Sequence, residues 1–506
     1  MKDKSYFIYL LSNILVLSII IIITFFSSQY FVIAHDDMVV CFVDKNNSIF
    51  HNFFTYVYHG RYISNIMVKL QCGLFDIHPI VWIRTYGAIM KAIFLFFVLH
   101  LLSSTLFLFQ GENSNKKLKY VCTPLVTLFC YFIYQFSIHG GYEDMLYTFF
   151  YGFVFPFIFF ILFWNKFIPL YINRKVLTTS DLKYLCIVSF FLGISTEIVI
   201  FVSFITLSIL FLSDYIKKCT LVKQYSLPFI LFLLSSALYV INPAFLEDAS
   251  SKNILNNEYE IKELILNLIP EFLNQCIFTI KEYFAIPTFL IIFFIVLIII
   301  RKKYNILLLK IVLLLLSSTY LFYILLFFAG KAPGNVFYAL HPSTNIQIVI
   351  ILVYIFFVLI SFIDLKKYIK LTIIFLTLFY ILLFKVSFID NIDKICIDGI
   401  KNYTSYGQKE ISKNRYIFDS IILFYAKNGK QIVIPKFYLG FPINIPSYLE
   451  NVYNIKCADI SNAIYLEADD AYKKYLQDGG KVITEEEIEK GDFKKLKIEY
   501  SQKHNN

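Results

Sequence analysis

The sequence predicts an all-α polytopic membrane protein of about ten or eleven transmembrane helices, followed by a small α/β domain outside the membrane. The first observation is composition: 58% of the 506 residues are hydrophobic and only 16% are charged, which is too apolar for a soluble protein of this size. The second is a series of long apolar segments before residue 390. The third is a change to ordinary soluble composition after it, where the apolar run QIVIP at 431–435 predicts a strand. We therefore expect a membrane core at residues 1–389 and a soluble domain at 390–506.

Apolar segments long enough to cross about 30 Å of hydrocarbon recur throughout the core. They occupy residues 6–32, 88–109, 121–138, 146–163, 226–241, 284–300, 307–328, 346–363 and 371–388. The first is longer than a signal-peptide core of about 7–15 residues and is followed by no small-residue cleavage pattern, so we expect it to be retained. A further segment, 184–212, is long for one helix and is interrupted by GISTE at 193–197.

The distribution of Lys and Arg predicts the topology, because cytoplasmic loops carry an excess of these residues. Basic clusters lie at residues 116–119, 174–183, 217–223, 301–303 and 366–370. Two of them flank segment 184–212, which we therefore interpret as a hairpin of two short helices. This topology places the N-terminus in the cytoplasm and the C-terminal domain outside a cytoplasmic (inner) membrane. It also places loop 33–84 and the amphipathic segment 245–283 on the outer side.

Charge also bears on the partners of the protein. The formal net charge is +10, but basic and acidic residues balance from residue 390 onward, so the excess belongs to the membrane core. This pattern indicates a lipid bilayer as partner and no nucleic acid. The nine cysteines form no CxxC pair and accompany no His cluster, so the sequence predicts no zinc or redox site.

Two adjacent acids, Asp36 and Asp37 in AHDDMVV, follow the first predicted span at the outer surface. Partial desolvation makes a carboxylate more basic, which suits it to accept a proton from a hydroxyl group; two carboxylates also suit a divalent cation such as Mg or Mn. The alternative is that a charged pair only marks the membrane boundary. These residues are the candidate catalytic and metal-binding residues.

Cations and an aromatic residue follow in the same outer loop. Arg61, in YHGRYIS, has a guanidinium fork that can bind a phosphate through two hydrogen bonds. Trp82 can stack on a sugar face, and Arg84 lies just before the second span. The alternative for all three is an interfacial anchor.

The remaining candidate residues lie in later outer segments. Glu143 and Asp144, in HGGYEDM, either cap the next helix or form a second acidic site. Glu197 interrupts an apolar stretch, where a carboxylate is costly unless it is paired or lines a wet cavity. The loop GKAPGNVFYALHPSTN contributes three further candidates for binding an anion: Lys331, Asn335 and His341. A plain hairpin turn is the alternative for this loop.

Taken in order over about residues 1–390, these motifs resemble the bacterial membrane glycosyltransferases of the C-type superfamily, in particular members similar to O-antigen glucosyltransferases. The resemblance implies that a sugar moves from a polyprenyl-phosphate donor to a glycan or lipid-linked acceptor outside the cytoplasmic membrane. It also implies that Asp36 and Asp37 supply the base or metal ligand of the first outer loop. The family often has a basic residue soon after the late Pro-Gly-Asn motif, but here Val336 and Phe337 follow, so Arg61 is the expected phosphate clamp.

Two other classes of protein remain open at this stage. A transporter or lipid flippase would use intramembrane acids such as Glu197 in a polar pathway. The related halves that many transporters contain are not visible in the sequence. A scaffold would instead bind a partner through its C-terminal domain.

Overall fold

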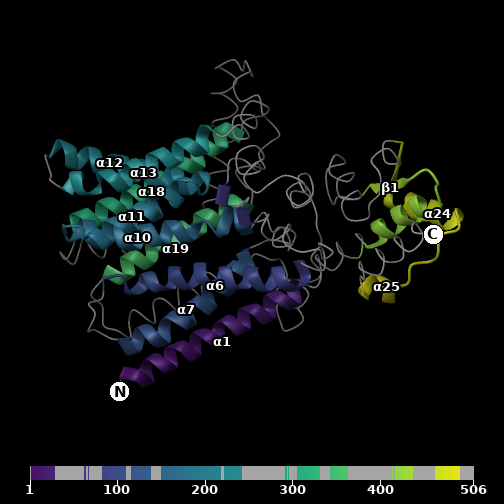
Figure 1. The fold of residues 1–506 in the computed structure, drawn as a ribbon, viewed down its shortest axis with the longest axis horizontal. Helices are drawn as coiled ribbons and strands as arrows, with labels where there is room; N and C mark the ends of the chain where they lie inside the picture. Colours follow the sequence, from purple (N-terminus) through teal and green to yellow (C-terminus); the bar gives the residue numbers. More distant parts are fainter. Residues whose placement is uncertain are drawn as a thin grey trace, which may run out of the picture.

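The computed structural model describes twelve helical segments of the membrane core and a smaller set of C-terminal elements (Figure 1). The described residues are 2–28, 62–63, 66–67, 83–109, 116–137, 150–217, 221–241, 291–292, 295, 305–330, 342–362, 413, 416–436 and 462–490. The core segments are α1 (Lys2–Ser28), η1 (Ile83–Gly87), α6 (Ala88–Ser104), η2 (Thr105–Phe107), α7 (Lys116–Ser137), η3 (Phe150–Val154), α10 (Phe157–Ile172), α11 (Thr179–Gly193), α12 (Glu197–Ile216), α13 (Leu221–Ile241), α18 (Ile306–Gly330) and α19 (Pro342–Phe362).

The protein is a multi-pass membrane protein. Six helices in the described residues are long and apolar enough to cross a bilayer: Tyr6–Phe26, Arg84–Phe107, Phe150–Ile172, Glu197–Ile216, Lys223–Ile241 and Ile306–Leu325. Shorter apolar helices are Cys122–Phe132 and Gln347–Phe362. The predicted spans at 284–300 and 371–388 and the predicted amphipathic segment 245–283 lie almost entirely outside the described residues.

The predicted break in segment 184–212 is confirmed. Helix α11 ends at Gly193 and α12 begins at Glu197, with residues 194–196 between them. Helix α11 starts before the apolar stretch because Thr178 and Asp181 form a capping box, in which the Asp181 amide donates to the Thr178 hydroxyl over 3.2 Å. Each helix of the pair then has its own main neighbour: α11 packs against α13, and α12 packs against α18.

One predicted span ends nine residues too early. Segment 146–163 was expected to cross the membrane, but the candidate span runs from Phe150 to Ile172. The apolar run stops in the sequence at Asn165 and Lys166, whereas the helix continues because both side chains find partners. Asn165 exchanges hydrogen bonds with Thr105 and accepts one from the Tyr354 hydroxyl over 3.2 Å, and Lys166 pairs with Asp181 at 2.6 Å. Such bonds satisfy polar groups between membrane helices.

We name the two ends of the helix bundle after Arg84 and Lys217. At the Arg84 end, α1 and α13 finish and α6 and α12 begin. At the Lys217 end, α12 finishes and α13 begins. Polar contacts fasten both ends: Ser28 Oγ donates to the Arg84 carbonyl over 3.0 Å, and at the opposite end Tyr9 and His100 are hydrogen-bonded over 3.0 Å.

The C-terminal part contains strands as well as helices. Strands β1 (Val433–Lys436) and β2 (Ile464–Glu467) pair in parallel with Val433 opposite Ile464. Helix α24 (Ala468–Gln477) follows β2 directly, and α25 (Glu485–Lys490) comes after a turn. The strand expected from QIVIP at 431–435 is thus present. The Tyr425 hydroxyl donates to Asp478 over 2.8 Å and, together with Lys474, holds the pKa of that carboxyl below its usual value.

Candidate functional site

The structure describes two of the predicted site residues, Arg84 and Glu197. The others lie outside the described residues: Asp36, Asp37, Arg61, Trp82, Glu143, Asp144, Lys331, Asn335 and His341. The two residues that directly follow Arg61, Tyr62 and Ile63, are described.

Tyr62 and Ile63 are buried in the fold, and Tyr62 contacts helix α13. Both side chains are buried, with 7% and 8% of their surface exposed. The Tyr62 hydroxyl donates to the Leu238 carbonyl over 3.1 Å. Leu238 lies in the last turn of α13, where carbonyl groups lack partners within the helix, so this bond supplies one. The chain next to Arg61 is therefore fixed at the Arg84 end of the bundle.

The break between α11 and α12 lies against the same part of α13. Gly193, the last residue of α11, approaches α13 so closely that a β-carbon there would lie 2.7 Å from the Phe232 carbonyl oxygen and 2.9 Å from the Ser236 nitrogen. Ser189 precedes Gly193 by one turn and is also buried, which gives the small-residue spacing typical of close helix pairs in membranes.

Two motifs that are far apart in the sequence thus converge. The GISTE break contacts α13 at Phe232, Ser235 and Ser236, and Tyr62 contacts it at Leu238. Residues 232–241 of α13 span about 15 Å of helix. Tyr62 and the GISTE break therefore both contact the C-terminal half of α13.

Glu197 lies at the start of α12, next to this convergence. Residues 194–196 are buried, and Glu197 itself is half-buried in the first turn of the helix. An ionised carboxylate is stabilised there by the positive end of the helix dipole. Glu197 therefore lies at a helix terminus, where its carboxylate oxygens can accept hydrogen bonds from hydroxyl groups.

Two basic residues lie just before and within the start of α6. Arg84 is half-buried on the π-helical turn η1, and Lys91 follows about two turns later with only 1% of its surface exposed. The Lys91 ammonium lies 5.9 Å from the ring centroid of Phe150 in η3. A cation at this depth of an apolar helix is costly and is commonly functional. Sequence reasoning missed Lys91, although a single lysine within AIMKAIFLFF was the available signal.

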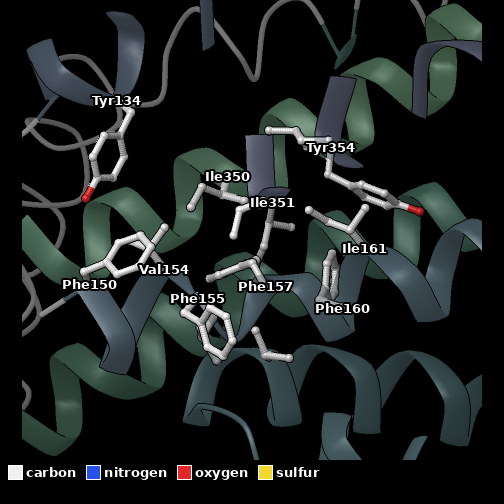
Figure 2. Close-up of a cluster of buried hydrophobic side chains, with 14 of the residues drawn as sticks. Tyr134, Phe150, Val154, Phe155, Phe157, Phe160, Ile161, Ile350, Ile351 and Tyr354 are labelled. Atoms are coloured by element: carbon white, nitrogen blue, oxygen red, sulfur yellow. The ribbon is translucent and has the colours of Figure 1, made fainter. Parts of the chain in front are cut away.

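Hydrophobic packing fixes the position of η3 beneath Lys91. Figure 2 shows Phe150, Val154 and Phe155 in one buried cluster with side chains of α10 and with Ile350 and Ile351 of α19. The Gln347 amide adds a hydrogen bond to the Phe153 carbonyl over 3.3 Å. The aromatic face opposite Lys91 is therefore held by two helices.

The predicted divalent cation rests on the sequence alone. Within the described ranges, no three His, Cys, Asp or Glu side chains are grouped so that they could hold a metal. Asp36 and Asp37, the predicted ligands, are outside those ranges. Metal binding by the acid pair stays a prediction.

Comparisons with known protein families, with curated proteins and with solved structures found no match. The resemblance to the C-type glycosyltransferases therefore rests on the residues and on the order of their motifs.

Removing the Tyr62 hydroxyl tests whether the anchored loop takes part in binding. We expect Tyr62→Phe to lower stability by about 1 kcal/mol, because one partly buried hydrogen bond is lost, and to raise the KM for a lipid-phosphate donor more than it lowers kcat. Tyr9→Phe is the matched control, since it removes a hydrogen bond at the opposite end. An unchanged KM in Tyr62→Phe, or an equal rise in Tyr9→Phe, would argue against a role of this anchor.

Proposed function

We propose that the protein is a membrane glycosyltransferase that moves a sugar from a polyprenyl-phosphate donor to a glycan or lipid-linked acceptor on the extracytoplasmic side. The observation that carries the proposal is the meeting of Tyr62 with the last turn of α13, beside the break that ends at Glu197. Tyr62, which directly follows Arg61 in the sequence, contacts the last turn of α13, and Glu197 lies in the first turn of α12; these two positions support a site that includes Arg61. A lipid-linked substrate requires such a place, where its tail stays between helices and its headgroup meets polar side chains.

The proposed reaction is a single displacement at the anomeric carbon. The acceptor oxygen attacks that carbon and its proton passes to the Asp37 carboxylate, with Asp36 as the neighbouring acid. The bond between the anomeric carbon and the phosphate oxygen breaks, and its electron pair leaves with the lipid phosphate. A single displacement inverts the anomeric configuration.

The leaving phosphate needs a cation more than a proton donor, because it leaves as an anion. Arg61 serves as the clamp in this proposal, with one guanidinium fork on two phosphate oxygens. Arg84 and Lys91 add positive charge in the outer part of α6, and Trp82, Glu143, Asp144 and Glu197 are the proposed contacts to sugar hydroxyls. Lys331, Asn335 and His341 are the proposed additional contacts to phosphate. Where the acid pair holds Mg or Mn, the ion would add charge stabilisation at the same phosphate.

The alternative function is a transporter or lipid flippase that uses Glu197 in a polar pathway. Its half-buried carboxylate at the start of α12 is the observation in its favour. The two functions differ in their products: an enzyme forms a new glycosidic bond, whereas a transporter returns its substrate unchanged.

The test is sugar transfer in membranes that contain the full-length protein. Polyprenyl-phosphate donors with radiolabelled sugars are supplied, and label is followed into extractable glycan or glycolipid. We expect transfer with at least one donor, and its loss in Arg61→Gln with matched expression. Label that crosses the membrane and stays on the original lipid, with dependence on Glu197 and not on Arg61, would contradict the enzyme and support the transporter.

A further inference from the structure

The Lys217 end of the bundle carries a group of exposed cations. They come from the turn between α10 and α11, from α11, from the end of α12 and from the start of α13: Arg174, Lys175, Lys183, Lys217 and Lys223. We call these five residues the cationic end. Elements adjacent in sequence bring them to the same end of the helices, because the chain reverses direction at each turn.

The acids described at this end are already engaged. Asp181 pairs with Lys166 at 2.6 Å and closes the capping box of α11. Asp214 accepts a hydrogen bond from the Tyr171 hydroxyl over 2.6 Å. Within the described residues of these four helices, the exposed cations therefore outnumber the acids that face them. The surface has a net positive charge.

Exposed apolar side chains lie directly beside two of these cations. Val176 follows Lys175 and is 74% exposed; Tyr215 and Ile216 precede Lys217 and are 73% and 70% exposed. A surface that faces only water gains nothing from such residues. Cations next to apolar residues suit the boundary between lipid headgroups and acyl chains, where long basic side chains reach the phosphates.

The turn that carries Arg174 and Lys175 is held in place. The Leu177 backbone amide donates to the Gln224 side-chain oxygen of α13 over 3.2 Å. The Asn173 side-chain amide donates to the Pro169 carbonyl over 2.8 Å. Arg174 itself has a positive φ of 49°, a conformation that surrounding contacts must maintain in a residue other than glycine. The turn that carries Arg174 and Lys175 therefore has a defined conformation.

We propose that the cationic end binds the headgroups of anionic phospholipids. The phosphates accept hydrogen bonds from the five cations, and Val176, Tyr215 and Ile216 contact the first acyl carbons. Each cation near an anionic membrane surface strengthens binding by about fivefold. The Lys217 end therefore faces the more anionic leaflet, whatever reaction the other end performs.

The test uses the full-length protein in a non-ionic detergent, with phosphatidylglycerol or phosphatidylcholine added. Native mass spectrometry counts bound lipids and thermal unfolding measures their effect. We expect tighter binding and a larger rise in Tm with phosphatidylglycerol, and a loss of this preference at high salt because the interaction is electrostatic. Equal binding of the two lipids, or a preference unaffected by salt, would overturn the proposal.

Two matched double variants test whether the cationic end is the site that binds phosphatidylglycerol. Lys175→Gln/Lys217→Gln should weaken phosphatidylglycerol binding by about 25-fold. The control Lys473→Gln/Lys481→Gln removes two exposed cations from the C-terminal part. It should leave phosphatidylglycerol binding unchanged. A preference that survives the first pair, or falls equally with the second, would contradict the assignment. If the first pair fails to fold, the lipid and salt comparison on the unmodified protein decides.

Discussion

Replacing Asp37 with asparagine should lower the rate of sugar transfer by about 100- to 10,000-fold while the protein still folds. The proposed role of Asp37 is to accept the proton of the acceptor hydroxyl, and general bases typically contribute that much to a rate. An amide of nearly the same shape keeps the local packing but cannot accept the proton. The measurement is transfer of radiolabelled sugar in membranes with matched expression, together with the Tm of the purified protein.

Two companion variants make the result specific. Asp36→Asn distinguishes the two adjacent acids. If it lowers the rate of sugar transfer less than Asp37→Asn does, Asp37 is the residue that accepts the proton. If the two variants lower the rate equally and activity depends on a metal, the two acids bind one shared ion. Glu197→Gln should reduce transfer less, because its proposed contact is to sugar hydroxyls. Full activity in Asp37→Asn would remove the proposed base from the mechanism.

Replacing Gly193 with leucine should destabilise the protein by at least about 3 kcal/mol. Even a β-carbon at this position meets the Ser235 side chain and lies 2.7 Å from the Phe232 carbonyl oxygen. Backbone atoms of α13 cannot move away cheaply, so α11 must separate from α13. The measurement is thermal unfolding of the purified protein in detergent, and we expect Gly193→Ala to show a smaller loss in the same direction.

A rescue variant separates close packing from other causes. Ser235→Gly removes the side chain that the new β-carbon meets first, so Gly193→Ala/Ser235→Gly should recover part of the stability that Gly193→Ala loses. Ser189→Ala is the control, since it adds no volume one turn away. If Gly193→Leu unfolds at the temperature of the unmodified protein, the close approach of α11 and α13 is wrong.

Sequence reasoning predicted the helical core well where local signals agreed. The interruption at GISTE and the basic clusters on both sides of segment 184–212 both indicated two helices, and α11 and α12 are separate. It ended the predicted span 146–163 too early because the apolar run stops at Asn165, whose partners Thr105 and Tyr354 come from distant parts of the chain. The hydrogen-bonding groups of a polar residue in a span find partners on distant helices, and the local sequence does not show those partners.

The candidate site was harder to predict from the sequence, because it also depends on contacts between distant parts of the chain. The motif YHGRYIS and Glu197 were each identified, but the contact of Tyr62 with α13 depends on a hydrogen bond to Leu238, which lies 176 positions further along the chain. Lys91 was overlooked because one lysine hardly changes the hydropathy of α6. Only its burial and its position over the Phe150 ring identify it as a candidate functional residue. Similarly, the strand at QIVIP was expected, but its parallel pairing with β2 was not.

The most direct test of the central claim is to locate the bound donor. A polyprenyl-phosphate sugar analogue with a photoreactive group next to the phosphate is cross-linked to the full-length protein, and the labelled peptides are identified by mass spectrometry. The proposed function predicts labels around residues 59–63, at 193–197 and at the end of α13, all lost when natural donor competes. Labels confined to the Lys217 end, or labels at the Arg84 end that natural donor does not displace, would contradict it.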